Sequence, residues 1–235
     1  MDIRELNAEE LQAFLDENGS SLLEEEALRV LANRYCTPRI ALEIANDPRL
    51  TSYYTVRAEL VRHRATPQSH AMKFVHHLYW RDLLKFSTET RIAAAVRRAI
   101  EQQMLVRLPA LTLGEKITAA RACSRELIRS FLIDPNPRVF EALLVNPRLT
   151  EDDLVAHVVA GRASAPQLIA ISRSQKWSFR LPLRRALVTN PETPKSVAAS
   201  QLPHLPRGDR EALANHPKVS VYLKKCIERL RVAGR

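Results

Sequence analysis

Glycine is scarce in this sequence, with 5 residues in 235, and aromatic residues make up only 6%. The phosphate-binding and nucleophile motifs GxGxxG, P-loop, GxSxG and the zinc motif HExxH are all missing. The three cysteines, Cys36, Cys123 and Cys226, form no CxxC pair, and no apolar run approaches the roughly 20 residues of a membrane span. The sequence therefore predicts neither an enzyme nor a metal or cofactor protein.

Localisation is predicted from the amino terminus. The opening MDIRELNAEEL is acidic and polar, unlike a secretory signal or a transit peptide. We therefore expect a cytoplasmic protein that does not enter a membrane.

Abundant Leu, Ala, Arg and Glu instead favour helix, because these side chains lose little rotamer freedom there. Most of the 14 prolines follow Thr, Asn or Asp between apolar periodic runs, where they mark helix boundaries. No segment alternates with period two for long enough to predict a strand. The expected fold class is all-α, with a hydrophobic content of 46% that suffices for a continuous core.

Helix starts are predicted from capping residues. Asn7 with Glu10 has the spacing of a capping box, and Ser21 with Glu24 repeats it. Thr37 supplies a cap oxygen before Pro38, which lacks an N–H and so fits the first turn. Further starts are expected at Thr66-Pro67, Asn136-Pro137, Thr150 with Asp153, Ser164 before Pro166, and Thr193-Pro194. The intervening helices are short, about 8 to 14 residues, as packed antiparallel pairs require.

The sequence repeats itself at an offset of 127 residues. Twelve of the 45 positions from 57 to 101 are identical to those from 184 to 228, against about three expected from average residue usage. The identical pairs include Leu60/Leu187 and Pro67/Pro194, and conservative pairs preserve the apolar stripe. We conclude that a supersecondary unit is duplicated within the chain.

Apolar helix ends that meet Asn and Pro recur along the chain and carry a resemblance. The pattern is found at Asn46-Asp47-Pro48, Asn146-Pro147, Asn190-Pro191 and Asn215-His216-Pro217. Over most of residues 28–231 the chain thereby resembles the HEAT-like and leucine-rich-repeat-variant class of bacterial helical repeats. The resemblance implies a right-handed α-solenoid of short antiparallel helix pairs. The iron-sulfur cysteine cluster of some variant-repeat proteins is absent here.

Domain boundaries are expected as follows. Residues 1–27 form an acidic helical cap, and 28–235 form a single helical-repeat domain. Within that domain, copy one covers about 28–104, middle helices cover 105–154, and copy two covers about 155–231.

Charge is unevenly distributed. Residues 1–27 carry a net charge of −8 and the remainder a net charge of +18, which together give the net charge of +10. This asymmetry suggests an acidic partner for the body, or an acidic segment that lies against its basic surface. Basic positions also recur in the two copies, and we predict a binding row from them, consisting of Arg57, Arg97, Arg98, Arg184, Lys224 and Lys225.

Two other groups of residues are weaker candidates. His63, His70, His76 and His77 are clustered, but His70 and His77 lie about 10 Å apart along a helix and cannot share one ion. Trp80 with Asp82, or Trp177, would suit an alkylpurine DNA glycosylase, a helical-repeat enzyme with a basic concave surface; Trp177 reads better as core.

The leading functional hypothesis is a non-catalytic scaffold whose curved surface binds another protein. The alternative is a nucleic-acid-binding solenoid, in which the basic row follows a phosphate backbone. A glycosylase-like enzyme is a remote third.

Overall fold

The computed structural model describes residues 2–232, and within them every regular element is a helix. The chain divides into two compact units, residues 1–111 and 112–235. This division differs from the predicted boundary at residue 27. Residues 2–27 are built into the first unit, where Leu11, Leu15 and Leu22 are buried in one core with Ile40 and Ile44.

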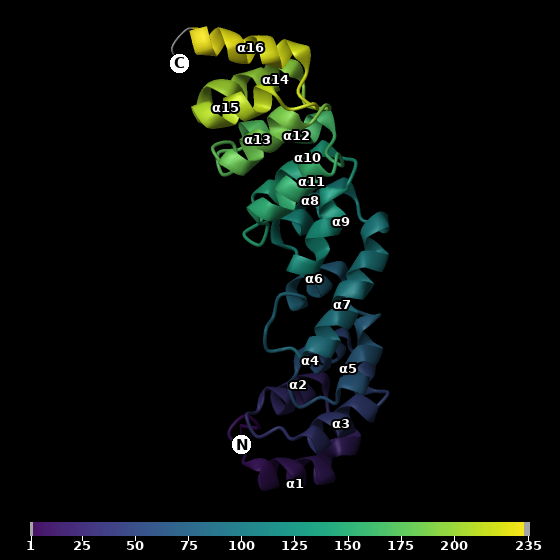
Figure 1. The fold of residues 1–235 in the computed structure, drawn as a ribbon. Helices are drawn as coiled ribbons and strands as arrows, with labels where there is room; N and C mark the ends of the chain where they lie inside the picture. The colour runs from purple at the N-terminus through teal and green to yellow at the C-terminus, as the bar shows by residue number, and fades with distance from the viewer. Residues whose placement is uncertain (1, 233–235) are drawn as a thin grey trace. The chain divides into compact units, whose positions relative to one another are not determined.

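The first unit contains seven α-helices in its described part (Figure 1). Short turns of 3₁₀ helix follow three of them, at Gly19–Ser21, Leu50–Ser52 and Leu108–Ala110. The α-helices are α1 (Ala8–Asn18), α2 (Glu24–Ala32), α3 (Pro38–Asn46), α4 (Tyr54–Arg62), α5 (Gln68–Val75), α6 (Trp80–Phe86) and α7 (Ala94–Arg107).

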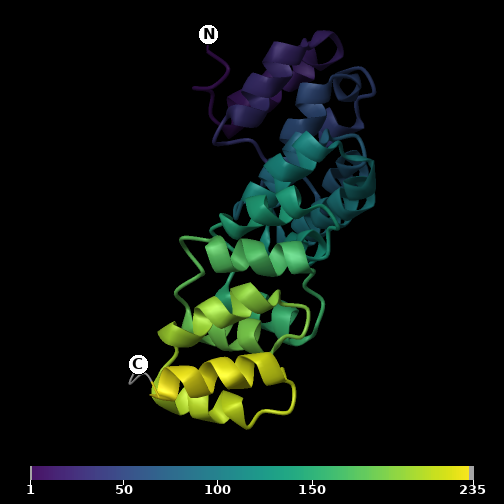
Figure 2. The same ribbon diagram turned by 90° about the horizontal axis from the view of Figure 1, so that it is seen from above.

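The second unit contains nine α-helices in its described part, and Figure 2 shows several of them lying side by side. They are α8 (Leu113–Ala122), α9 (Ile128–Leu132), α10 (Pro137–Leu144), α11 (Glu151–Val159), α12 (Ala165–Arg173), α13 (Leu181–Thr189), α14 (Lys195–Gln201), α15 (Arg207–Ala214) and α16 (Val221–Val232).

The internal duplication is visible in the helices themselves. Each of α11 to α16 begins 127 residues after the corresponding helix of α2 to α7. The packing is repeated too, since α2 packs on α4 and α5 on α7 in the first unit, as α11 packs on α13 and α14 on α16 in the second. The repeat thus starts at residues 24 and 151, earlier than the sequence identities indicate.

Most predicted helix starts are confirmed. Asn7 and Glu10 form a reciprocal capping box, as do Thr150 and Asp153. Thr37 accepts the N–H of Ile40, with Pro38 in the first turn. Asn136 caps α10 by accepting the N–H of Arg138, and Ser164 caps α12.

One predicted start is wrong, and at two others the helix begins as expected but without a threonine cap. Ser21 does not cap α2, because residues 19–21 form a 3₁₀ turn in which its hydroxyl donates to the Asn18 carbonyl; the helix begins at Glu24 instead. Thr66 and its equivalent Thr193 do not cap either. Both hydroxyls are buried without a hydrogen-bond partner, and α5 and α14 begin after the following proline.

Buried asparagines tie neighbouring turns together inside each unit. The side-chain amide of Asn33 donates to the carbonyls of Ile3 and Leu6 at 2.8 and 2.9 Å, and that of Asn190 donates to Val158 at 2.7 Å. Each side-chain oxygen accepts the backbone N–H two residues later. Every such asparagine therefore shapes its own turn and holds the end of another segment.

One buried pair differs between the copies. His157 and Gln167 bond to each other at 3.2 Å, where the first copy has the apolar residues Val30 and Ile40. Burial lowers the pKa of His157 from its ordinary 6.5, with a further lowering from Arg162, although Gln167 acts in the opposite direction. The folded protein therefore holds His157 neutral more strongly than the unfolded chain does.

This pKa shift predicts acid sensitivity. Because the unfolded state binds the proton more readily, stability is full above pH 6.5 and declines as the pH falls from there through the lowered folded pKa. We expect His157→Phe to flatten the fall in thermal midpoint between about pH 7 and pH 5, measured by circular dichroism. The same substitution at exposed His77 is the control. Equal slopes for wild type and His157→Phe would contradict the assignment.

Candidate functional sites

The structure places the predicted basic row in two kinds of environment. Arg57 and Arg184 are half-buried at equivalent positions in α4 and α13. The Arg184 guanidinium donates to the carbonyls of Ser178 and His204 at 2.8 and 3.2 Å, and Arg57 donates to Ser52 at 3.4 Å. These arginines donate hydrogen bonds to carbonyl oxygens of residues within their own unit.

The remaining members of the row lie on α7 and α16. Arg97 is half-buried and donates to the Glu89 carbonyl at 3.4 Å, and Lys224 is half-buried as well. Arg98 and Lys225 are exposed. The structure therefore leaves Arg98 and Lys225 exposed, although Arg98 donates to the Ala94 carbonyl at 3.4 Å, and it gives three of the others carbonyl contacts within the protein.

Two tyrosines meet in the first unit, and each has an aromatic neighbour in the chain; the sequence names all four as the few aromatic residues near the basic row that could stack on bases. We call Tyr53, Tyr54, Tyr79 and Trp80 the aromatic edge. The rings of Tyr54 and Tyr79 lie 4.3 Å apart between centroids, tilted by 33°. The Tyr54 hydroxyl donates to the Asp82 carboxylate and accepts the N–H of Tyr79 at 3.1 Å.

These contacts fix the aromatic edge while leaving much of it accessible. Tyr79 is 64% exposed and Tyr53 is 41% exposed. Burial and the hydrogen bond to Asp82 raise the pKa of Tyr54 to about 12, so its hydroxyl keeps its proton at neutral pH. The Arg81 guanidinium lies 5.4 Å from the Trp80 ring centroid. The aromatic edge is thus held in place before any ligand arrives.

The second copy has a different surface at the same backbone positions. An offset of 127 puts Arg180 in place of Tyr53 and Arg207 in place of Trp80, while Leu181 and Pro206 replace the stacked tyrosines. Arg180 and Arg207 are exposed. The duplicated framework therefore carries aromatic residues in the first unit and cationic residues in the second.

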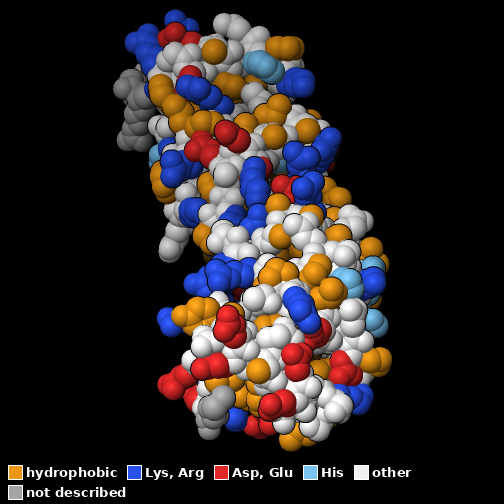
Figure 3. Space-filling view, turned by 90° about the horizontal axis from the view of Figure 1, so that it is seen from below, with side chains coloured by type: hydrophobic (Ala, Val, Ile, Leu, Met, Phe, Trp, Pro, Cys, Tyr) orange, Lys and Arg blue, Asp and Glu red, His pale blue; other side chains and the backbone are white. Residues whose placement is uncertain are grey.

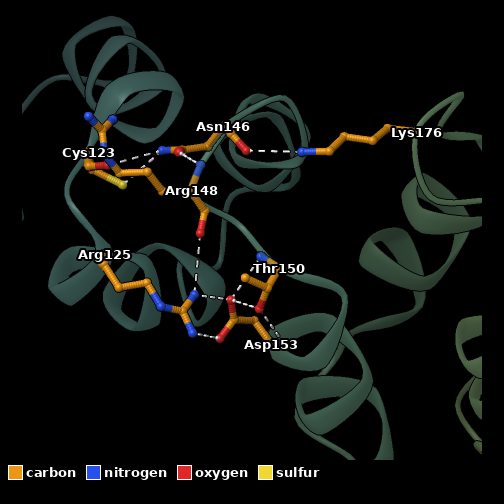
Figure 4. Close-up of polar contacts among 7 residues, drawn as sticks. All are labelled: Cys123, Arg125, Asn146, Arg148, Thr150, Asp153 and Lys176. Atoms are coloured by element: carbon orange, nitrogen blue, oxygen red, sulfur yellow. Dashed lines mark hydrogen bonds and ion pairs between the residues drawn. The ribbon is translucent and has the colours of Figure 1, made fainter.

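A polar network joins three turns of the second unit, which follow α8, α10 and α12 (Figure 4). We call Cys123, Arg125, Asn146, Arg148, Thr150, Asp153 and Lys176 the turn node. At its centre, the fully buried Asn146 donates to the Ala120 carbonyl at 2.8 Å and to the Cys123 carbonyl and Sγ at 3.3 Å. Its side-chain oxygen accepts the Arg148 N–H at 2.8 Å.

Cations complete the turn node. Arg125 forms a bidentate ion pair with Asp153, the acid that also caps α11, and the hydrogen bonds of this carboxylate lower its pKa despite its partial burial. Lys176 Nζ donates to the Asn146 carbonyl at 3.3 Å. The first copy repeats this last contact, where Arg49 donates to the Gly19 carbonyl at 3.0 Å. The node is a structural joint between turns.

The net charge belongs entirely to the second unit. Residues 1–111 contain 15 Lys and Arg and 15 Asp and Glu, whereas residues 112–235 contain 21 and 11, so the latter carry the whole net +10. In Figure 3, acidic side chains gather over the N-terminal helices, and Lys and Arg spread over the C-terminal unit. The acidic residues 1–27 are thus balanced by bases within their own unit.

The weaker candidates are placed as follows. Trp177 is 3% exposed and its indole donates to the Leu144 carbonyl at 2.8 Å, which confirms it as core. Asp82 lies two residues after Trp80, and its carboxylate accepts the hydrogen bond of the Tyr54 hydroxyl. Burial raises the pKa of the Cys36 and Cys123 thiols to about 12. Across residues 2–232, no three His, Cys, Asp or Glu side chains gather closely enough to hold a metal ion.

Membrane insertion was tested on the helices directly. Among the described residues, none of the helices combines the length and the apolar character needed to cross a bilayer.

Comparison with protein-family models, curated proteins and solved structures finds no match to this chain. The function is therefore inferred from the geometry of the candidate sites.

Proposed function

We propose that this protein is a non-catalytic helical-repeat scaffold, a right-handed α-solenoid of the HEAT-like or leucine-rich-repeat-variant kind, that binds another protein in the cytoplasm. The observation that carries the proposal is the aromatic edge, where the exposed Tyr79 packs on Tyr54 and is followed in the chain by Trp80 and Arg81, whose guanidinium lies over the Trp80 ring. Tyr, Trp and Arg are the residue types that dominate binding energy at protein interfaces.

The rigidity of the aromatic edge favours binding. An exposed aromatic side chain normally loses rotamer freedom when a partner covers it. Here Tyr54 is already tied to Asp82 and to the Tyr79 backbone, and its ring is stacked against that of Tyr79. Less ordering is left to occur on association, so more of the contact energy contributes to affinity.

The test is capture of cellular partners by the full chain with the edge altered. We expect Tyr53→Ser with Tyr79→Ser to reduce recovery of specific partners by at least about tenfold, equivalent to 1.4 kcal/mol. The control is Tyr35→Ser with Tyr222→Ser, which removes two other exposed tyrosines, 41% and 47% exposed. Quantitative mass spectrometry of crosslinked complexes gives the readout. Equal recovery with both double variants would refute the proposed interface.

Nucleic-acid binding by residues 112–235 is the second candidate. The observation that favours it is the confinement of the net +10 to this unit. A phosphate-binding surface would lose affinity steeply with salt, by roughly one power of salt concentration per phosphate neutralised. If this candidate is right, titrating duplex DNA at several salt concentrations gives a slope of several powers, and reversing the charges of exposed Arg148 and Arg173 lowers it. No binding at low salt would eliminate it.

A further inference from the structure

We propose that the aromatic edge binds an acidic polypeptide segment that also carries apolar side chains. This inference rests on the proposed scaffold function and names the chemistry of the partner.

Helix α6, which begins at Trp80, carries two exposed cations. Arg81 and Lys85 are exposed and lie four residues apart, hence on one face of α6. The single acid of this helix, Asp82, is occupied by the Tyr54 hydroxyl. A third guanidinium, that of Arg107, donates to the carbonyls of His76 and Leu78 in the turn before Tyr79. Carboxylates of a ligand would therefore find Arg81 beside the Trp80 ring and Lys85 one turn further along α6.

The aromatic residues supply the apolar half of the recognition. Tyr79 and Tyr53 offer large rings to apolar side chains, and ring faces bury much area at low entropic cost. A ligand that is acidic alone would gain little from such exposed ion pairs, because solvent and salt screen them. A ligand that combines both kinds of side chain uses the rings and the two cations together.

A peptide fits this edge better than single-stranded nucleic acid does. The first unit as a whole is neutral, with 15 bases and 15 acids, so it has no net charge to attract a polyanion. One face of Tyr54 is already covered by Tyr79. Base stacking needs open ring faces along a basic groove.

The second copy offers an internal comparison. The equivalents of Arg81 and Lys85 are Gly208 and Ala212, and the rings are replaced as well. The rings and cations of the first unit are thus not repeated at the equivalent positions of the second, where Arg180 instead lies 5.1 Å from the centroid of the exposed Phe179 ring. Duplication alone would have kept both sets alike.

The experiment uses the full chain and a short fluorescein-labelled peptide of alternating Asp or Glu with Leu or Phe. Binding is followed by fluorescein anisotropy and by intrinsic tryptophan fluorescence. A change in the tryptophan signal reports on Trp80, because Trp177 is buried and out of reach of the ligand. We expect the acidic peptide to bind, and its analogue with Lys in place of the acids not to bind. Arg81→Glu and Tyr79→Ala should each weaken binding about tenfold or more.

The matched controls are Arg39→Glu and Tyr35→Ala, an exposed base and an exposed tyrosine in the segment from residue 35 to 39. Circular dichroism verifies that all variants remain folded. Failure of the acidic peptide to bind, equal losses in test and control variants, or tighter binding of oligothymidylate of equal length would each overturn the proposal. If the peptide fails while the tyrosine double variant still loses its cellular partners, the scaffold function stands and only the partner chemistry is wrong.

Discussion

Replacing Phe140 by alanine is expected to destabilise the second unit by about 4 kcal/mol. Phe140 is fully buried, its ring is stacked at 6.0 Å on that of His157, and its helix α10 packs against both α8 and α12. Removal of the ring leaves a cavity that three helices border and that none can fill without moving. Urea unfolding monitored by circular dichroism measures the loss.

Phe179→Ala is the matched control for this substitution. Phe179 belongs to the same unit but is 56% exposed, so its removal should change stability by less than about 1 kcal/mol. Similar losses for the two variants would show that α10 is not the centre of this core.

Asn146→Ala is expected to cost about 3 kcal/mol, because it removes the centre of the turn node. The carbonyls of Ala120 and Cys123 and the N–H of Arg148 would all lose their partner in a buried environment. Asn146→Asp should recover only part of the loss, since a carboxylate still accepts from Arg148 but cannot donate to carbonyls.

The control for Asn146 is Asn46→Ala, which removes an exposed asparagine from the same Asn-Pro sequence pattern. Its expected effect is below about 0.5 kcal/mol. If thermal unfolding of the two variants gave equal midpoints, the buried hydrogen bonds of the turn node would not be the source of its stability.

Local signals predicted the fold most successfully. Capping boxes such as Asn7 with Glu10 depend on residues within one turn, and the structure confirms them. Thr66 and Thr193 do not cap their helices, because the proline that follows each of them, and not the threonine, precedes the first helical residue. The right-handed superhelix stays a prediction.

The predicted copies begin at about residues 28 and 155, and the matched helices α2 and α11 begin at residues 24 and 151. Identities are frequent between residues 57 and 101, but in α2 and α3 the core itself has changed, from Val30 and Ile40 to His157 and Gln167. Helix boundaries survived this exchange because they depend on caps and on spacing. A comparison of side chains alone misses a repeat that the backbone preserves.

The aromatic edge lay beyond prediction because its members meet through tertiary structure. Tyr54 and Tyr79 are 25 residues apart, at the starts of two helices that are not consecutive. The sequence identifies each aromatic residue, yet nothing in the spacing shows that the Tyr54 hydroxyl accepts the backbone N–H of Tyr79. The predicted basic row illustrates the converse, since recurrence located Arg57 and Arg184 correctly as equivalent positions while their bonds to turn carbonyls required the structure.

The contact shared by Arg49 with Gly19 and by Lys176 with Asn146 has an evolutionary consequence. In both copies the acceptor is a main-chain oxygen, which every amino acid possesses. Substitution at residue 19 or 146 cannot delete that oxygen, and either Arg or Lys can reach it. A joint of this kind persists when the side chain of the acceptor residue changes, as between Gly19 and Asn146, although the Asn146 side chain has a structural role of its own.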